Sequence, residues 1–91
     1  MIQKTITVTQ AQGLHMRPAG LLAAAMGKKQ CNVTVMYNGR SINAKSVMNL
    51  MAAGIKCGSQ LQLVCDGADE EQAMQEAVAL LQEESIQETD L

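Results

Sequence analysis

The sequence has almost no aromatic residues: Tyr37 is the one aromatic among 91 residues, and Trp and Phe are absent. The core must therefore be aliphatic, and stacking of bases on aromatic side chains, a common basis of single-strand binding, is excluded. The net charge of −2 and a pI of about 5.2 also argue against a nucleic-acid partner. We therefore expect no binding to nucleic acid.

Long apolar runs are missing as well. The longest, residues 18–27, has about half the length that a bilayer-spanning helix needs, and residues 1–9 alternate instead of forming the apolar block of a signal peptide. A hydrophobic fraction of 47% and a charged fraction of 18% are typical of a folded chain. We therefore expect one cytoplasmic domain over residues 1–91, with a frayed acidic tail over about residues 85–91 and no membrane insertion.

Cysteines are few and show no paired spacing. Cys31, Cys57 and Cys65 are odd in number and form no Cys-x-x-Cys motif, which predicts neither a disulfide framework nor a zinc site. Cys31 and Cys65 fall at inward-facing positions of expected strands, where they act as small apolar fillers, and Cys57 falls in a loop. We expect a reducing compartment, no metal and no cofactor.

Carboxylates are absent from residues 1–65, which contain all seven basic residues, and all nine acidic residues follow from Asp66 onward. One interpretation is that the last helix simply presents a solvated acidic face. The other is that a site built from residues 1–65 has a positive local field. Such a site suits phosphate or an acidic partner and does not suit chemistry that requires paired carboxylates.

Hydrophobic periodicity predicts seven elements. Period-two alternation indicates strands over residues 2–9, 31–37, 40–43 and 61–65, and helical spacing indicates helices over residues 18–27, 46–54 and from 69 onward. This order, βαββαβα, predicts an α+β open-faced β-sandwich: a four-stranded, mostly antiparallel sheet with three helices on one face.

Local signals support several of these elements. Asn38-Gly39 is typical of a two-residue hairpin turn. Ser46 is a candidate cap for the second helix, and Asp69 with Gln72 indicates a capping box for the third. In the first helix we expect a buried stripe that contains Leu21, Leu22, Ala25 and Met26.

The single histidine, His15, directly precedes the helix that Pro18 helps to start. A helix N-terminus offers unpaired N–H groups and about half a positive charge, which together stabilise a phosphate, and Arg17 can add a fork of donors. A neutral imidazole can attack a phosphoryl group without a base or a metal. From spacing alone, a loop histidine with no role explains His15 equally well.

The sequence contains two motifs in register: Gly13-Leu14-His15-Met16-Arg17-Pro18-Ala19, and Ala44-Lys45-Ser46-Val47-Met48 followed by Gly54. Together they are similar to the HPr family, the phosphocarrier proteins of the bacterial phosphoenolpyruvate-dependent sugar phosphotransferase system. The resemblance extends from residue 1 to about residue 85.

The resemblance implies a covalent phosphotransfer intermediate without enzymatic turnover of its own. In this reading His15 is phosphorylated on Nδ1 by Enzyme I and passes the phosphoryl group to the IIA domains of sugar permeases. Arg17 neutralises the phosphate, the N–H groups of Met16 and Arg17 bind its oxygens, and Pro18 fixes the helix start. The family usually has Ala, Ser or Thr where Met16 stands, so we expect Met16 to alter partner preference or transfer rate without abolishing activity.

The resemblance also implies a regulatory role for Ser46, as the target of an ATP-dependent HPr kinase/phosphorylase, although a helix-capping serine explains this residue too. Val47, Met48 and Met51 follow at helical spacing. They are either core residues or a surface that meets Enzyme I, the IIA domains, the kinase and a transcriptional regulator of carbon catabolite control. Methionine suits a surface that serves several partners.

Two functional hypotheses follow from the sequence. The first is a monomeric phosphocarrier that acts through His15. The second is a regulatory or protein-binding module of the same fold, which acts through Ser46 and the surface of Val47, Met48 and Met51. The family resemblance implies that regulatory relatives lack the histidine, and His15 is present here.

Overall fold

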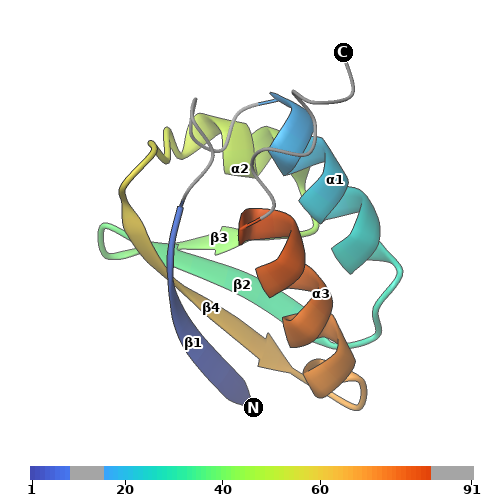
Figure 1. Ribbon diagram of the computed structural model, residues 1–91. Helices are drawn as coiled ribbons and strands as arrows, with labels where there is room; N and C mark the ends of the chain where they lie inside the picture. The colour runs from blue at the N-terminus through green and yellow to red at the C-terminus, as the bar shows by residue number, and fades with distance from the viewer. Residues whose placement is uncertain (9–15, 83–91) are drawn as a thin grey trace.

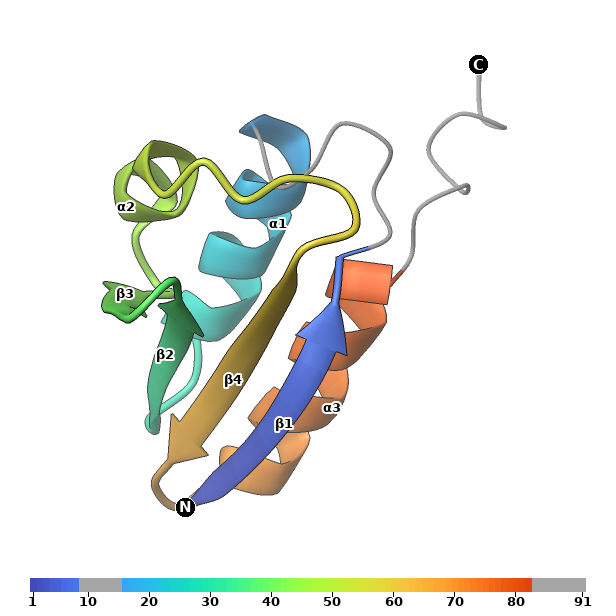
Figure 2. The same cartoon turned by 90° about the vertical axis from the view of Figure 1, so that its left-hand side faces the viewer.

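The computed structural model describes residues 1–8 and 16–82, and these form one antiparallel sheet covered on one face by helices (Figures 1 and 2). The strand order across the sheet is β1-β4-β2-β3, and each pairing is antiparallel. The predicted open-faced sandwich with the order βαββαβα is confirmed. The elements in chain order are β1 (Ile2–Thr7), α1 (Met16–Gly27), β2 (Asn32–Tyr37), β3 (Arg40–Asn43), α2 (Val47–Ala52), β4 (Gln60–Asp66) and α3 (Glu70–Gln82).

Alternation along the strands decides which face of the sheet is buried. On β4, Leu61, Leu63 and Cys65 are at most 2% exposed. The register places Ile6 of β1 opposite Leu61 and Val35 of β2 opposite Leu63, so apolar side chains from neighbouring strands meet beneath the helices. No helix of the described part of the chain lies over the opposite face of the sheet (Figure 2).

Helix α1 contacts both α2 and α3 and buries one stripe of side chains at helical spacing: Ala19, Leu22, Ala23 and Met26. The prediction that Leu21 belongs to this stripe is wrong, because Leu21 is 41% exposed. Successive residues lie about 100° apart around a helix. Leu22 points into the core, and this offset turns its neighbour Leu21 toward solvent. No helix within residues 1–8 and 16–82 has the length and apolar character needed to cross a bilayer.

The predicted hairpin between β2 and β3 is confirmed. Asn38 and Gly39 connect the strands with φ values of 51° and 77°, the left-handed conformations that a two-residue turn of this kind needs at both positions. Tyr37 pairs with Arg40 directly beside the turn. The turn thus sets the register of β3 on β2.

Cys31 and Cys65 are both at most 1% exposed, as expected for apolar fillers, whereas Cys57 is exposed. Burial, followed by the nearby Asp69, raises the pKa of the Cys31 thiol to about 11, and burial also raises the pKa of Cys65. The fraction of the reactive thiolate form is therefore low at both buried cysteines.

Asp69 joins the start of α3 to the segment that leads into β2. Its two carboxylate oxygens accept hydrogen bonds from the backbone N–H groups of Gln30 and Cys31, each at 2.9 Å. The sequence predicted that Asp69 would form a capping box with Gln72, but its carboxylate serves this connection between distant segments instead. The N–H of Gln30, and then that of Cys31, holds the pKa of Asp69 at about 2, below the ordinary value of 3.8.

Replacing Asp69 by Asn should lower the stability of the fold in a pH-dependent way. A neutral amide has one acceptor oxygen in place of two charged ones, so we expect Asp69→Asn to lower Tm by about 4 °C or more at neutral pH. Because the folded pKa is depressed, the contribution of Asp69 is complete above the unfolded pKa of 3.8 and is lost as the pH falls through about 2. The measurement is thermal unfolding followed by circular dichroism from pH 7 to pH 2. A difference in Tm between the two proteins that stays constant over this range would contradict the assignment.

Candidate functional site

Helix α1 begins at Met16, immediately after the single histidine of the sequence. Pro18 is the third helical residue and has no N–H to donate, so the first-turn donors are the N–H groups of Met16 and Arg17, which have no helical carbonyl one turn earlier. The first turn contains no acidic residue that could occupy these donors or neutralise the positive end of the helix dipole. This end of α1 therefore offers an anion two backbone donors and a positive dipole.

The predicted helix start at Pro18 was two residues late. Proline is tolerated in the first turn of a helix, and Met and Arg are good helix formers. The helix therefore extends back to Met16. His15 lies outside the described residues, and so do the side chains of Met16 and Arg17. Their roles in accepting and binding a phosphoryl group stay predictions.

Ser46 caps α2, as predicted. Its Oγ accepts a hydrogen bond from the N–H of Asn49 at 3.3 Å, and its carbonyl accepts one from Leu50 at 3.1 Å. The neighbouring ammonium of Lys45 donates to the carbonyl of Lys29 at 2.9 Å, which ties the start of α2 to the segment after α1. Helices α1 and α2 contact each other and lie side by side (Figures 1 and 2).

The predicted surface of Val47, Met48 and Met51 divides into two parts. Val47 is half-buried against the core, whereas Met48 is 75% exposed and Met51 is 38% exposed. Leu50 is fully buried and takes up the inward side of this six-residue helix. Both methionines are therefore available to a partner.

Leu21, which the sequence predicts to be buried, is a further exposed apolar residue. It lies on α1, which contacts α2. The name α1–α2 apolar surface is used below for the exposed large apolar side chains of these two contacting helices, which are Leu21, Met48 and Met51. Leu21 could have been recognised by its angular offset from the stripe formed by Ala19, Leu22 and Met26.

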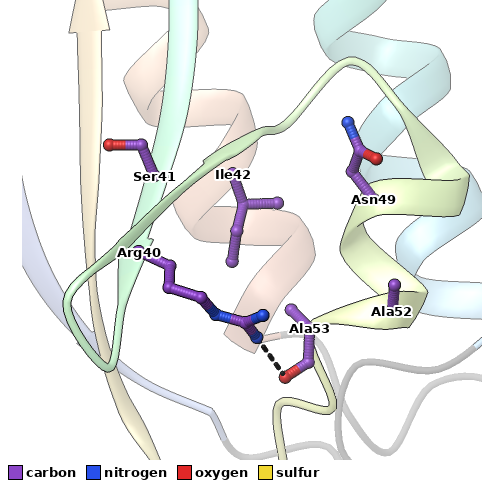
Figure 3. A pocket seen from close by; sticks show the side chains of 6 residues that line it. All are labelled: Arg40, Ser41, Ile42, Asn49, Ala52 and Ala53. Carbon is purple, nitrogen blue, oxygen red and sulfur yellow. Dashed lines mark hydrogen bonds between the residues drawn. The ribbon is translucent and has the colours of Figure 1, made fainter.

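Arg40 holds the other end of α2. Its Nη2 donates to the carbonyl of Ala53 at 3.4 Å, where a cation is favourable because the C-terminal end of a helix carries partial negative charge (Figure 3). Together with Asn49 and Ser41 it lines a shallow hollow of about 260 Å³ between β3 and α2. The sequence predicts Arg40 as a basic residue at the start of the strand over residues 40–43, but its contact with Ala53 depends on the tertiary fold and has no local signal.

The charges of the described residues follow the segregation seen in the sequence. The elements α1, β2, β3 and α2 contain no Asp or Glu. Asp66 and Glu70 lie near the amino group of Met1, which is 3.0 Å from Glu70, and this is the end of the molecule opposite α2 (Figure 2). Among the described residues, His, Cys, Asp and Glu form no group of three that could hold a metal ion.

The fold and this site define a small α+β sandwich with a helix start directly after a histidine and free of first-turn carboxylates. Residues 2–83 match the family described as the PTS HPr component phosphorylation site. The chain belongs to this family, and the resemblance inferred from the two sequence motifs is confirmed.

Individual relatives agree with the family assignment. The phosphocarrier protein HPr of Mycoplasma capricolum is 40% identical over 75 residues, which cover 82% of this chain and 84% of that protein. The HPr-like protein Crh of Bacillus subtilis is 33% identical over 84 residues, covering 92% of this chain and 99% of Crh. A crystal structure of HPr from Thermoanaerobacter tengcongensis superposes with a TM-score of 0.85 at 34% identity, covering 89% of this chain and 91% of that one.

Proposed function

We propose that this protein is a phosphocarrier that accepts a phosphoryl group from phospho-Enzyme I on His15 and passes it to IIA components of sugar permeases. The observation that carries the proposal is the start of α1 at Met16, one residue after the single histidine of an HPr-family chain. The protein is then a covalent intermediate in phosphotransfer and acts as a cytoplasmic monomer.

The chemistry requires one bond to form as another breaks. The Nδ1 lone pair of neutral His15 attacks phosphorus, and the bond between phosphorus and the donor breaks with its electron pair leaving on the donor. The N–H groups of Met16 and Arg17 and the positive end of α1 neutralise charge on the phosphoryl oxygens, and the guanidinium of Arg17 adds bidentate donors. Because α1, β2, β3 and α2 contain no carboxylate, nothing on these elements repels the incoming group.

The α1–α2 apolar surface is the partner surface in this proposal. Met48 and Met51 project from α2 into solvent, and Leu21 does so from α1. Thioether side chains are flexible and polarizable, so one surface can adapt to Enzyme I and to IIA domains in turn.

The similarity to Crh supports a second candidate, a regulatory protein of the same fold that acts through Ser46 and does not carry phosphate on histidine. The two candidates differ in the donor that they use. Incubation with phosphoenolpyruvate and Enzyme I gives an acid-labile phosphohistidine in a carrier and no product in a protein that acts through Ser46 only. If several active Enzyme I preparations leave the chain unmodified, the regulatory candidate replaces the carrier.

We also propose that Ser46 is phosphorylated from ATP by an HPr kinase/phosphorylase, and its cap geometry allows a specific test. Ser46→Ala removes both the hydroxyl and the cap, so it should block the acid-stable product and cost about 1 kcal/mol of stability. Ser46→Asn keeps an N-cap oxygen and should block the product with little change in stability. Mass spectrometry and thermal unfolding measure the two effects. An unmodified wild-type chain in the presence of a competent kinase would refute regulation at Ser46.

A further inference from the structure

The methionines of this protein differ sharply in access to solvent. Met26 is 0% exposed and Met74 is 3% exposed, and both lie in the core. Met48 is 75% exposed and Met51 is 38% exposed, on the same turn-and-a-half helix α2. Met36 is half-buried and its sulfur accepts a hydrogen bond from Ser41 at 3.1 Å. Oxidants in solution therefore reach the sulfur of Met48 before those of the core methionines.

We propose that Met48 is a reversible oxidation site and that its sulfoxide weakens docking of Enzyme I on the α1–α2 apolar surface. The docking part of this inference rests on the proposed function. The oxidant is a peroxide: the thioether sulfur attacks one peroxide oxygen, the O–O bond breaks, and hydrogen peroxide leaves as water. Sulfur loses two electrons and gains one oxygen, and the peroxide is reduced.

The consequence for docking follows from desolvation. A thioether enters an apolar interface at little cost, whereas a sulfoxide carries a strongly polar S–O bond that must lose its hydrogen-bonded water or find a donor. Because Met48 is 75% exposed, its oxidation does not require opening of the core and leaves the fold intact. The effect is confined to the surface, and methionine sulfoxide reductases can reverse it with electrons from a dithiol.

The cysteines do not offer an equivalent switch. Cys31 and Cys65 are at most 1% exposed. Cys57 is exposed, but it lies in the segment between α2 and β4 and outside the α1–α2 apolar surface. Oxidation products of cysteine are not substrates of methionine sulfoxide reductases, so enzymatic rescue separates the two chemistries.

The first part of the test locates the oxidised sulfur. The full chain is treated with dilute hydrogen peroxide, and peptide mass mapping follows each sulfoxide over time. We expect Met48 to oxidise at least about tenfold faster than Met26 and Met74, since only the exposed thioether meets the oxidant without an opening of the core. Met1 is 71% exposed at the opposite end of the molecule and should oxidise as readily as Met48, which provides an internal reference (Figure 2). Equal rates for Met48 and Met74 would overturn the proposal.

The second part measures docking through phosphotransfer. The concentration of the chain is kept below its KM for Enzyme I. Under this condition the rate of phosphorylation from phosphoenolpyruvate should fall about fivefold or more after oxidation and recover after treatment with methionine sulfoxide reductases. Each variant is compared with its own untreated rate: Met48→Leu should abolish the peroxide-dependent loss, and the matched control Met36→Leu should retain it.

The outcomes separate this inference from the proposed function. If the untreated chain is phosphorylated and its Met48 sulfoxide form reacts at the same rate, docking control by Met48 is wrong. A loss that persists in Met48→Leu assigns the effect to another methionine and also overturns the proposal. If the untreated chain accepts no phosphoryl group, the proposed function itself fails, and with it the docking part, while the mapping still decides whether Met48 is the oxidation site.

Discussion

His15→Ala is expected to eliminate the acid-labile phosphorylation that phosphoenolpyruvate and Enzyme I produce in the wild-type chain. The reason is chemical: the imidazole is the single nucleophile of its type in the sequence, and alanine has no lone pair to attack phosphorus. We expect the rate of labelling to fall by at least about a thousandfold, to the limit of detection. Radiolabel incorporation from phosphoenolpyruvate, with acid treatment of a parallel sample, is the measurement.

Arg17→Ala serves as the control that separates charge neutralisation from the nucleophile. This variant keeps His15 and the backbone N–H groups, so transfer should slow by about 10–100-fold without disappearing. Its circular dichroism spectrum and Tm should match those of the wild type. Persistent acid-labile labelling of His15→Ala at the wild-type rate would place the nucleophile elsewhere, and a large fall in Tm for Arg17→Ala would make the arginine structural.

Gly67→Ala is expected to produce the largest loss of stability among conservative single changes in the turn between β4 and α3. Gly67 has a φ of +153°, and an added Cβ would lie 2.5 Å from the Cα and 2.6 Å from the Cβ of Cys31. The neighbour is backbone and cannot rotate away, and Asp69 holds the N–H of Cys31 in place at 2.9 Å. We expect a cost of about 3 kcal/mol, measured by chemical denaturation.

The matched control for this change is Gly20→Ala. Gly20 lies inside α1, and a Cβ added there would meet no atom within 4 Å apart from its chain neighbours and the nearby backbone of its own helix. The same substitution should therefore stabilise the protein by about 0.5–1 kcal/mol, because alanine is a better helix former than glycine. Similar effects at Gly67 and Gly20 would show that the close approach of Gly67 to Cys31 does not exist in solution.

Local signals were sufficient to predict the elements but not the contacts between distant segments. The hairpin at Asn38-Gly39 and the Ser46 cap depend on neighbouring residues, and both were predicted correctly. The hydrogen bonds of Asp69 with Gln30 and Cys31 join residues that are 39 and 38 positions apart in the sequence. No periodic pattern in the sequence marks contacts over such a separation. The local sequence around Asp69 therefore predicts a capping box instead of these long-range bonds.

The candidate site was predictable in part. The position of His15 before a helix with Pro18 in its first turn indicates a phosphate site. A loop histidine without a role fits the same spacing equally well. The second motif, around Ser46, is needed to indicate the family. The exposure of Leu21 follows from helical geometry and was missed. The exposure of Met48 depends on how six-residue α2 packs, with Leu50 inward, and periodicity over so short a helix could not decide it.

The most direct test of the phosphocarrier account is a two-step transfer that follows one phosphoryl group. The chain is labelled with phosphoenolpyruvate and Enzyme I, freed of both, mapped by mass spectrometry under alkaline conditions, and then mixed with IIA domains. The account predicts that the label lies on His15 and leaves the chain for a IIA domain. A label on any other residue, or a chain that Enzyme I does not label at all, would contradict it.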